Sequence, residues 1–124
     1  MTDVECGHAI PMEPKAVFDA ISNGRRRRVI LSVDREDAPV TTNELSVEIA
    51  ARENRVDPSM VTGEQRTRVY VALVQNHLGT LDTLGAARFD DRSKQVFPTE
   101  ATGPLARLIR QITTDCYTPT GAGD

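Results

Sequence analysis

A chain of 124 residues with a formal net charge of −3 is the right length for one compact domain with a single core. Its 39% hydrophobic and 27% charged residues are close to the globular average, and no stretch approaches the roughly 18 to 20 consecutive apolar residues of a membrane-spanning helix. We therefore expect a soluble protein with no membrane partner, and an aliphatic core, because tryptophan is absent and aromatic residues reach only 4%.

Two short helices are predicted first. Residues 14–22 begin with a proline suited to a first helical turn and precede Asn23-Gly24, a suitable stop signal. Residues 25–36 form the second candidate, although their short β-branched run leaves a strand as the alternative. The apolar faces of the two helices carry Val17, Phe18, Ile21, Val29, Ile30, Leu31 and Val33.

Two longer helices are predicted next, on either side of a connecting loop over residues 55–62. Thr42 is a suitable N-cap for the third helix, over residues 43–54. The fourth helix covers residues 63–84, and Gly79 is a candidate position for a kink. Its inward stripe consists of Val69 or Tyr70, Leu73, His77, Leu78, Leu81 and Leu84.

A β-hairpin over residues 86–99 follows, with a turn near residues 90–93. Pro104 then opens a last helix with a marked apolar stripe. The stripe consists of Leu105, Leu108, Ile109, Ile112 and Cys116. Either the rest of the domain or another molecule must cover it.

Helices followed by a hairpin and a final helix are the layout of a winged helix. The predicted fold class is therefore mainly α with a small β-hairpin: a winged helix-turn-helix plus a C-terminal amphipathic helix. The predicted organisation is a flexible N-terminal segment over 1–12, a winged-helix domain over 13–100, a C-terminal dimerisation helix over 101–117 and a flexible tail over 118–124.

Residue landmarks carry a resemblance to known winged helices. The stretch from Ala20 to Leu31 is similar to the arginine-rich opening of ArsR-like winged-helix regulators. A second set of landmarks, over roughly residues 14–100, resembles a haloarchaeal family of winged-helix domains of undescribed function. This set consists of Glu64-Gln65-Arg66, Arg68-Val69-Tyr70, Leu73, His77-Leu78, Leu81-Asp82 and Gly85. The resemblance implies the fold alone, because winged helices include DNA readers, RNA binders and protein-binding modules.

The choice of charged residues bears on the source. Lysine occurs only at Lys15 and Lys94, against ten aspartates and eight glutamates. This composition is typical of a halophilic proteome, and arginine in place of lysine is also typical of a GC-rich genome. The resemblance favours a halophilic archaeon. Two departures argue against an ArsR-like metal sensor: the third helix has no cysteine, and paired histidines and acids for a ligand set are missing.

A DNA-reading winged helix places its recognition helix in the major groove and its wing against the backbone. We expect the helix near residues 64–78 to read double-stranded DNA and the 86–99 wing to contact phosphates, because arginine and glutamine pair bidentately with guanine and adenine. The candidate contacts are Arg66, Thr67, Arg68, Val71 and Gln75 on the helix and Arg88, Arg92 and Lys94 on the wing. The alternative is a solvated face that carries arginine.

Arg25, Arg26, Arg27 and Arg28 form the densest charge in the chain. At the start of a helix they oppose the positive end of the helix dipole. Phosphate contact would explain them, and so would ion pairs within the protein, for example with Glu44 or Glu48.

The terminal stripe is predicted to mediate a homodimer, because we expect four helices and a hairpin to complete a core without it. It consists of Leu105, Leu108, Ile109 and Ile112. The resemblance implies a dimer contact alongside the first helix. Folding of the stripe back onto its own domain is the alternative.

Four side chains are capable of binding a metal: Cys6, His8, His77 and Cys116. They lack closely spaced partner ligands, so we predict no metal site and no cofactor, and interpret His77 as a packing histidine. No nucleophile triad or glycine-rich phosphate loop stands out, so we do not expect an enzyme. The two cysteines are expected to be free thiols in the cytoplasm.

The leading hypothesis is a homodimeric transcriptional regulator that binds double-stranded DNA. The alternative is a winged-helix protein-protein interaction module that does not bind nucleic acid. A third hypothesis is a ligand or redox sensor that uses Cys6 or Cys116. The sequence leaves the operator, the direction of regulation and any small-molecule effector open.

Overall fold

Helix α2 (Gly24–Glu36) lies at the centre of the computed structural model, which describes residues 9–116. Asn23 caps this helix: its side-chain oxygen accepts hydrogen bonds from the backbone N–H groups of Arg25 and Arg26 at 2.9 and 3.2 Å. The helix ends at Asp37, a left-handed residue whose N–H donates to the carbonyl of Val33 at 3.0 Å. The segment is therefore helical, as predicted, and the strand alternative is wrong. Its face of Val29, Ile30 and Val33 has no exposed surface.

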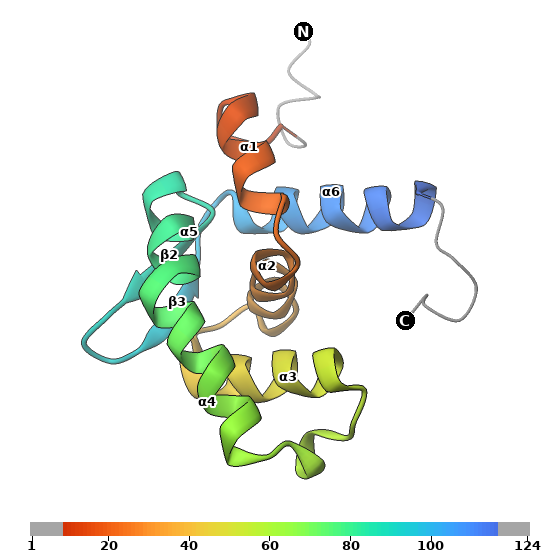
Figure 1. Ribbon diagram of the computed structural model, residues 1–124. Coiled ribbons are helices and arrows are strands. Elements are labelled where there is room, and N and C mark those ends of the chain that lie inside the picture. Colours follow the sequence, from red (N-terminus) through yellow and green to blue (C-terminus); the bar gives the residue numbers. More distant parts are fainter. Residues whose placement is uncertain (1–8, 117–124) are drawn as a thin grey trace, which may run out of the picture.

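Helix α6 (Thr102–Asp115) and helix α3 (Thr42–Asn54) lie on opposite sides of α2 (Figure 1). Leu105 and Ile109 of α6 are 0% and 2% exposed, so they complete the core of their own domain. The expectation that the whole terminal stripe serves dimerisation is wrong for these two residues, because α2 would be uncovered without them. The core therefore includes α6. Helix α1 (Pro14–Ile21) also packs against α2, through Val17 and Ile21.

A strand of two residues before α3 was not predicted. Strand β1 (Val40–Thr41) leads directly into α3, and Thr41, not Thr42, is the N-cap. The Thr41 hydroxyl accepts from the N–H of Glu44 at 3.0 Å, and the Glu44 carboxylate accepts from the N–H of Thr41 at 3.0 Å. Thr42 is fully buried instead, and its hydroxyl donates to the carbonyl of Lys94 at 2.8 Å.

Helix α4 (Gly63–Ala72), the π-helical segment η3 (Leu73–His77) and helix α5 (Leu78–Leu84) form one continuous rod (Figure 1). The rod begins at Gly63, as predicted. The helix begins there because Thr62 and Gln65 form a capping box. A short 3₁₀ turn, η2 (Pro58–Met60), lies in the loop before it. The irregularity expected at Gly79 lies in η3, and the rod ends at Gly85, whose φ is +84°.

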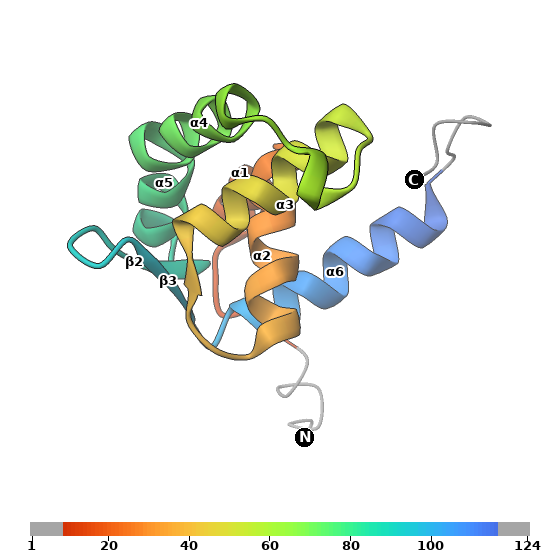
Figure 2. The same ribbon diagram turned by 90° about the horizontal axis from the view of Figure 1, so that it is seen from below.

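The hairpin consists of β2 (Ala87–Asp90) and β3 (Gln95–Pro98), within the predicted range. Strand β1 pairs with β3, so the three strands form an antiparallel sheet in the order β1-β3-β2. Val96 faces both Val40 and Phe89 and is buried. The hairpin and the α4–α5 rod lie on the side of the molecule opposite α6 (Figure 2).

The predicted fold class is confirmed: the molecule is mainly helical, with a small sheet, a C-terminal helix and an order of elements compatible with a helix-turn-helix plus wing. Its core is aliphatic, as expected. Within residues 9–116 no helix combines the length and the apolar character needed to cross a membrane.

Candidate nucleic-acid interface

The side of α4 and η3 that faces away from the core carries four of the predicted contact residues, three on α4 and Gln75 on η3. Val69, Leu73 and Leu78 are buried and fix the orientation of the rod. The opposite side exposes Thr67, Arg68, Val71 and Gln75. Val71 is 41% exposed and adds an apolar surface to this side. These four residues therefore form one accessible row, which we call the α4 face.

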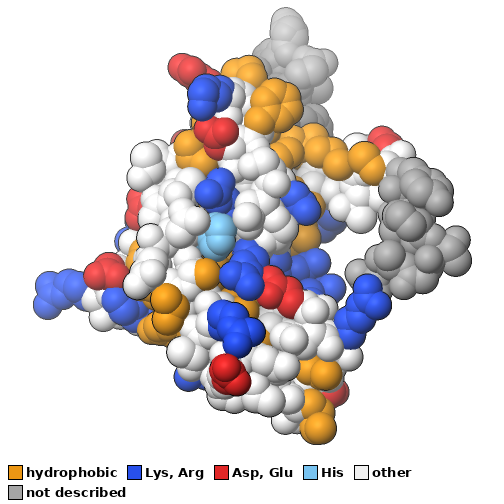
Figure 3. All heavy atoms as spheres, viewed as in Figure 1, with side chains coloured by type: hydrophobic (Ala, Val, Ile, Leu, Met, Phe, Trp, Pro, Cys, Tyr) orange, Lys and Arg blue, Asp and Glu red, His pale blue; other side chains and the backbone are white. Residues whose placement is uncertain are grey.

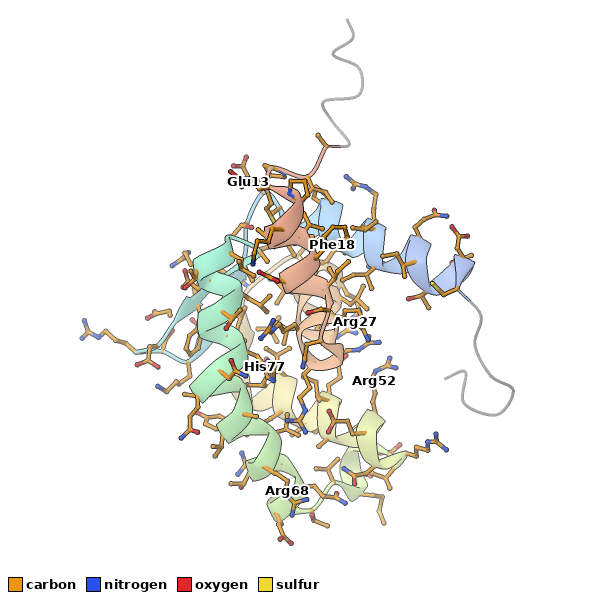
Figure 4. All side chains as sticks on the ribbon, turned by 45° about the horizontal axis from the view of Figure 1, so that its top comes forward. Glu13, Phe18, Arg27, Arg52, Arg68 and His77 are labelled. Carbon is orange, nitrogen blue, oxygen red and sulfur yellow. The ribbon has the colours of Figure 1, made fainter. Side chains whose placement is uncertain are left out.

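Arg68 is the cation of the α4 face and points away from the body of the protein (Figure 4). Its guanidinium pairs with Glu64 one turn earlier at 3.2 Å, and the two side chains are 69% and 82% exposed. An exposed pair of this kind contributes about 0.3 to 0.5 kcal/mol, so a stronger anion can displace Glu64.

Arg66 lies apart from this row. Its side chain is half-buried and donates to the Asn43 side-chain oxygen of α3 at 3.1 Å, with the guanidinium carbon 5.9 Å from the centroid of the Tyr70 ring. The sequence grouped Arg66 with the exposed residues, but the contact with α3 turns it toward the junction of the two helices. The contacts with Asn43 and Tyr70 hold the guanidinium of Arg66 in one orientation at this junction.

The three wing cations lie on one hairpin but differ in their surroundings. Arg88 stacks on Phe97, its cross-strand neighbour, with 4.1 Å between the guanidinium carbon and the ring centroid. Lys94 is left-handed, with a φ of +58°, and its Nζ contacts Asp91 at 2.7 Å. Arg92 is exposed in the turn. The wing thus presents one side chain at its tip and one held flat on the sheet.

The arginines of the run at the start of α2 point in different directions. Arg25 forms a bidentate pair with Glu53 at 2.6 and 2.8 Å, and Arg28 lies 4.0 Å from Glu48. Of the two predicted carboxylate partners, Glu48 is confirmed, and Glu44 is occupied in the N-cap of α3. Sequence reasoning missed Glu53, because it is 28 residues away from Arg25.

Arg26 and Arg27 bind neutral groups. Arg26 donates to the carbonyl of Asp19 at 2.8 Å and, through Nε, to Nδ1 of His77 at 3.3 Å. Arg27 donates to the carbonyl of Ile21 at 2.7 Å. These bonds tie the start of α2 to the end of α1, so part of the run has a structural role.

His77 packs between helices, as predicted, with 6% of its surface exposed. Burial lowers the pKa of His77, and the charges of Arg26 and Arg25 lower it further. The ring is therefore neutral at pH 7, and its Nδ1 accepts a hydrogen bond from Nε of Arg26. In Figure 3 it is visible as a small patch beside the arginines at the centre of the face.

The other metal-capable residues do not gather around His77. Cys116 is exposed at the end of α6, and the predictions for Cys6 and His8 lie outside the described residues. Among residues 9–116, no group of three or more histidine, cysteine or acidic side chains is arranged to hold a metal ion.

The residues of the terminal stripe differ in their exposure to solvent. Leu105 and Ile109 are buried, Leu108 is half-buried, and Ile112 is 39% exposed. Phe18 of α1 is 66% exposed, although it was predicted on the apolar face of that helix. Apolar side chains continue from α1 onto α6 along one edge of the molecule (Figure 3).

Comparison with known proteins gives one match. The profile of a family described as a domain of unknown function (DUF7344) matches residues 18–97, from α1 through the hairpin. No curated protein and no solved structure matches the chain.

Proposed function

The chain belongs to the DUF7344 family, and we propose that it is a homodimeric, sequence-specific DNA-binding regulator of the winged helix-turn-helix class. The α4 face carries this proposal. Thr67, Arg68 and Gln75 offer hydrogen-bonding groups, and Val71 offers a methyl surface for a thymine methyl group. All four lie on the second helix of the helix-turn-helix, where a major-groove reader needs them.

The wing supports the same mode of binding. β1 begins α3 and pairs with β3, so the hairpin is held to the start of the helix-turn-helix. Arg92 at its tip is placed to contact a phosphate. Arg88, flattened on Phe97, needs little further ordering to do the same.

Two apolar side chains support a dimer. Phe18 and Ile112 expose large apolar surfaces at one edge of the molecule, and a two-fold axis beside them would pair α1 and α6 with their copies. Such a dimer would display two α4 helices, and a spacing of about 34 Å would fit successive major grooves.

A haloarchaeal setting would shape the mechanism. Each phosphate contact costs about 0.9 decades of affinity per tenfold rise in salt, so binding by charge alone would fail in concentrated potassium chloride. Base contacts, apolar burial and two-site binding lose much less. A net charge of −3 is compatible with a reader of this kind.

The test is selection of duplex fragments by the full chain, followed by fluorescence-anisotropy titration in high potassium chloride. We expect at least one selected sequence to bind about 1000-fold more tightly than random duplex. Arg68→Ala and Gln75→Ala should each weaken binding by about tenfold or more and relax preference at one base position. Arg107→Ala, an exposed arginine on the far side of α6, is the matched control and should bind as the unmodified protein does.

A wing variant separates the two kinds of contact. Arg92→Ala should weaken selected and random duplexes alike and reduce the slope of log K against log salt by about 1. Equal affinity for selected and random duplexes would overturn the proposal.

The pairing of Arg68 with Glu64 favours a second candidate, a protein-protein interaction module, because it neutralises the only cation of the α4 face. In that case Arg68→Ala and Val71→Ser would impair capture of a partner protein, and no duplex would be selected.

A further inference from the structure

A cleft of 560 Å³ lies between the first turn of α2, the C-terminal part of α3 and the middle of α6. Its floor includes apolar side chains, from Leu31, Ile49 and Ile109. Among the described residues, Glu53 is the only carboxylate that lines it. Four arginines line it as well: Arg25, Arg27, Arg28 and Arg52.

Three of these arginines lack a carboxylate of their own. Glu53 is fully engaged by Arg25. Arg27 hydrogen-bonds only a neutral carbonyl, and for Arg52 no ion pair or side-chain hydrogen bond occurs within residues 9–116. Figure 4 shows Arg27 of α2 and Arg52 of α3 projecting into the same space.

Arg28 has only a share in one carboxylate. Glu48 lies 4.0 Å away, but it already accepts hydrogen bonds from Arg35 at 3.1 Å and from Ser32 at 2.8 Å. Burial lowers the pKa of Arg28, and the charges of Arg52 and Arg35 lower it further. The like charges thus repel one another, because Glu48 and Glu53 are each already hydrogen-bonded to another arginine.

The cleft also lies at the positive end of the α2 dipole, which adds to the potential of the guanidinium groups. A concave, partly apolar site of this volume is within the range of small-molecule pockets, about 300 to 1000 Å³. The phosphates of duplex DNA lie on a convex backbone and would not reach an apolar floor between helices. The surroundings therefore favour a small amphipathic anion over nucleic acid.

We propose that this cleft binds a small oxyanion, a phosphate or carboxylate group held by Arg27, Arg28 and Arg52, with an attached apolar part over Leu31, Ile49 and Ile109. The site joins α2 and α3 to α6, which is far from both in the sequence. A bound anion would remove the repulsion between the arginines and stabilise the packing of α6 and α3 on α2.

The test uses isothermal titration calorimetry and thermal unfolding of the full chain with three probes: inorganic phosphate, butyl phosphate and butanol. Ionic strength is held constant with potassium chloride. We expect both phosphates to bind saturably and raise Tm, butyl phosphate to bind more tightly, and butanol to have no effect. Butyrate in place of butyl phosphate then distinguishes a carboxylate ligand from a phosphate ligand.

Arg27→Gln and Arg52→Gln should each weaken butyl phosphate binding by about tenfold, while Arg107→Gln should leave it unchanged. Without added phosphate, Arg52→Gln should unfold at the same temperature as the unmodified protein or at a higher one, which shows that its loss of binding is not a loss of fold. Absence of saturable binding would overturn the proposal, and so would equal weakening in Arg107→Gln or equal affinity for the two phosphates. No DNA is present, so this result and the outcome of DNA selection are independent.

Discussion

His77 lies where α2 meets η3, and its Nδ1 accepts a hydrogen bond from Nε of Arg26 at 3.3 Å. Protonation of the ring would remove this acceptor and place a second positive charge beside Arg26. Protonation of His77 is therefore less favourable in the folded protein than in the unfolded chain, which is why its pKa is lowered. A histidine of this kind links the stability of the fold to pH.

We predict that the free energy of unfolding falls as pH is lowered from about 7 to 5, because the unfolded chain binds a proton near pH 6.5 that the folded chain refuses. The contribution of His77 is fully present above the unfolded pKa and is lost below it. Urea unfolding at several pH values measures the effect. His77→Gln keeps an acceptor for Arg26 and should have a flatter profile over this range. An unchanged slope in His77→Gln would contradict the assignment.

Glu48 acts at lower pH. Burial alone would raise the pKa of Glu48, but hydrogen bonds from Arg35 and Ser32 outweigh burial and hold the pKa below its ordinary value. Its stabilising contribution is therefore present above about pH 4.5 and is lost as pH falls through the folded-state pKa. The two residues affect stability in separate pH ranges.

At the scale of single elements, α6 has two functions along its length. Its first half carries Leu105 and Ile109 into the core. Arg110, at the start of the second half, pairs with Asp34 of α2 at 2.9 Å. Its second half, from residue 110 onward, is exposed. The apolar stripe of α6 is thus buried in the first half of the helix and accessible in the second half.

This division predicts unequal effects of truncation. Leu105→Ala should lower the free energy of unfolding by about 2 to 5 kcal/mol, because it leaves a cavity beside α2. Ile112→Ala should change it by less than about 1 kcal/mol. Chemical denaturation of the two variants at equal protein concentration tests the difference, in a buffer where the chain is monomeric. A cost at Ile112 equal to that at Leu105 would mean that the second half of α6 is packed as tightly as the first.

The α4–η3–α5 rod also has two parts. The capping box of Thr62 and Gln65 starts α4, and the π segment at 73–77 changes the direction of the side chains that follow. His77, the last residue of η3, and Leu78, the first residue of α5, are both buried. Thr67, Arg68 and Val71 of the α4 face lie before this change and follow ordinary helical spacing, whereas Gln75 lies within η3.

For the molecule as a whole, the large exposed apolar side chains other than Val71 of the α4 face lie at two places among the described residues. Phe18 and Ile112 lie on the edge formed by α1 and α6, whereas Met60, which is 67% exposed, lies in the η2 turn near α3 and α4. Phe18 is equally exposed, at 66%. The first edge joins two helices that can pair with a second copy about a two-fold axis.

We predict that the protein is a dimer in sedimentation-velocity experiments and that Phe18→Ser with Ile112→Ser shifts it to the monomer. The loss of apolar contact on both helices accounts for the change. Met60→Ser removes a side chain of matched exposure and should leave the dimer intact. A dimer that survives the double substitution, or dissociates with Met60→Ser, would place the interface elsewhere.

The helices of this protein, its hairpin and its aliphatic core could be predicted from the sequence. Apolar periodicity, the capping residues and the glycine after α5 act over a few residues, so they can be read locally. The same reasoning identified the exposed row Thr67, Arg68, Val71 and Gln75, because helical spacing places it opposite the buried stripe.

Features that depend on residues distant in the sequence could be recognised only in the tertiary structure. Strand β1 has two residues, too few for a period, and exists because β3 pairs with it. Arg25 and Arg26 meet Glu53 and His77 across 28 and 51 positions of sequence, so the meaning of the arginine run was hidden until α2, α3 and η3 packed together. The burial of Leu105 also depends on this packing. The sequence of α6 does not show that α2 has an apolar face left for Leu105 to cover.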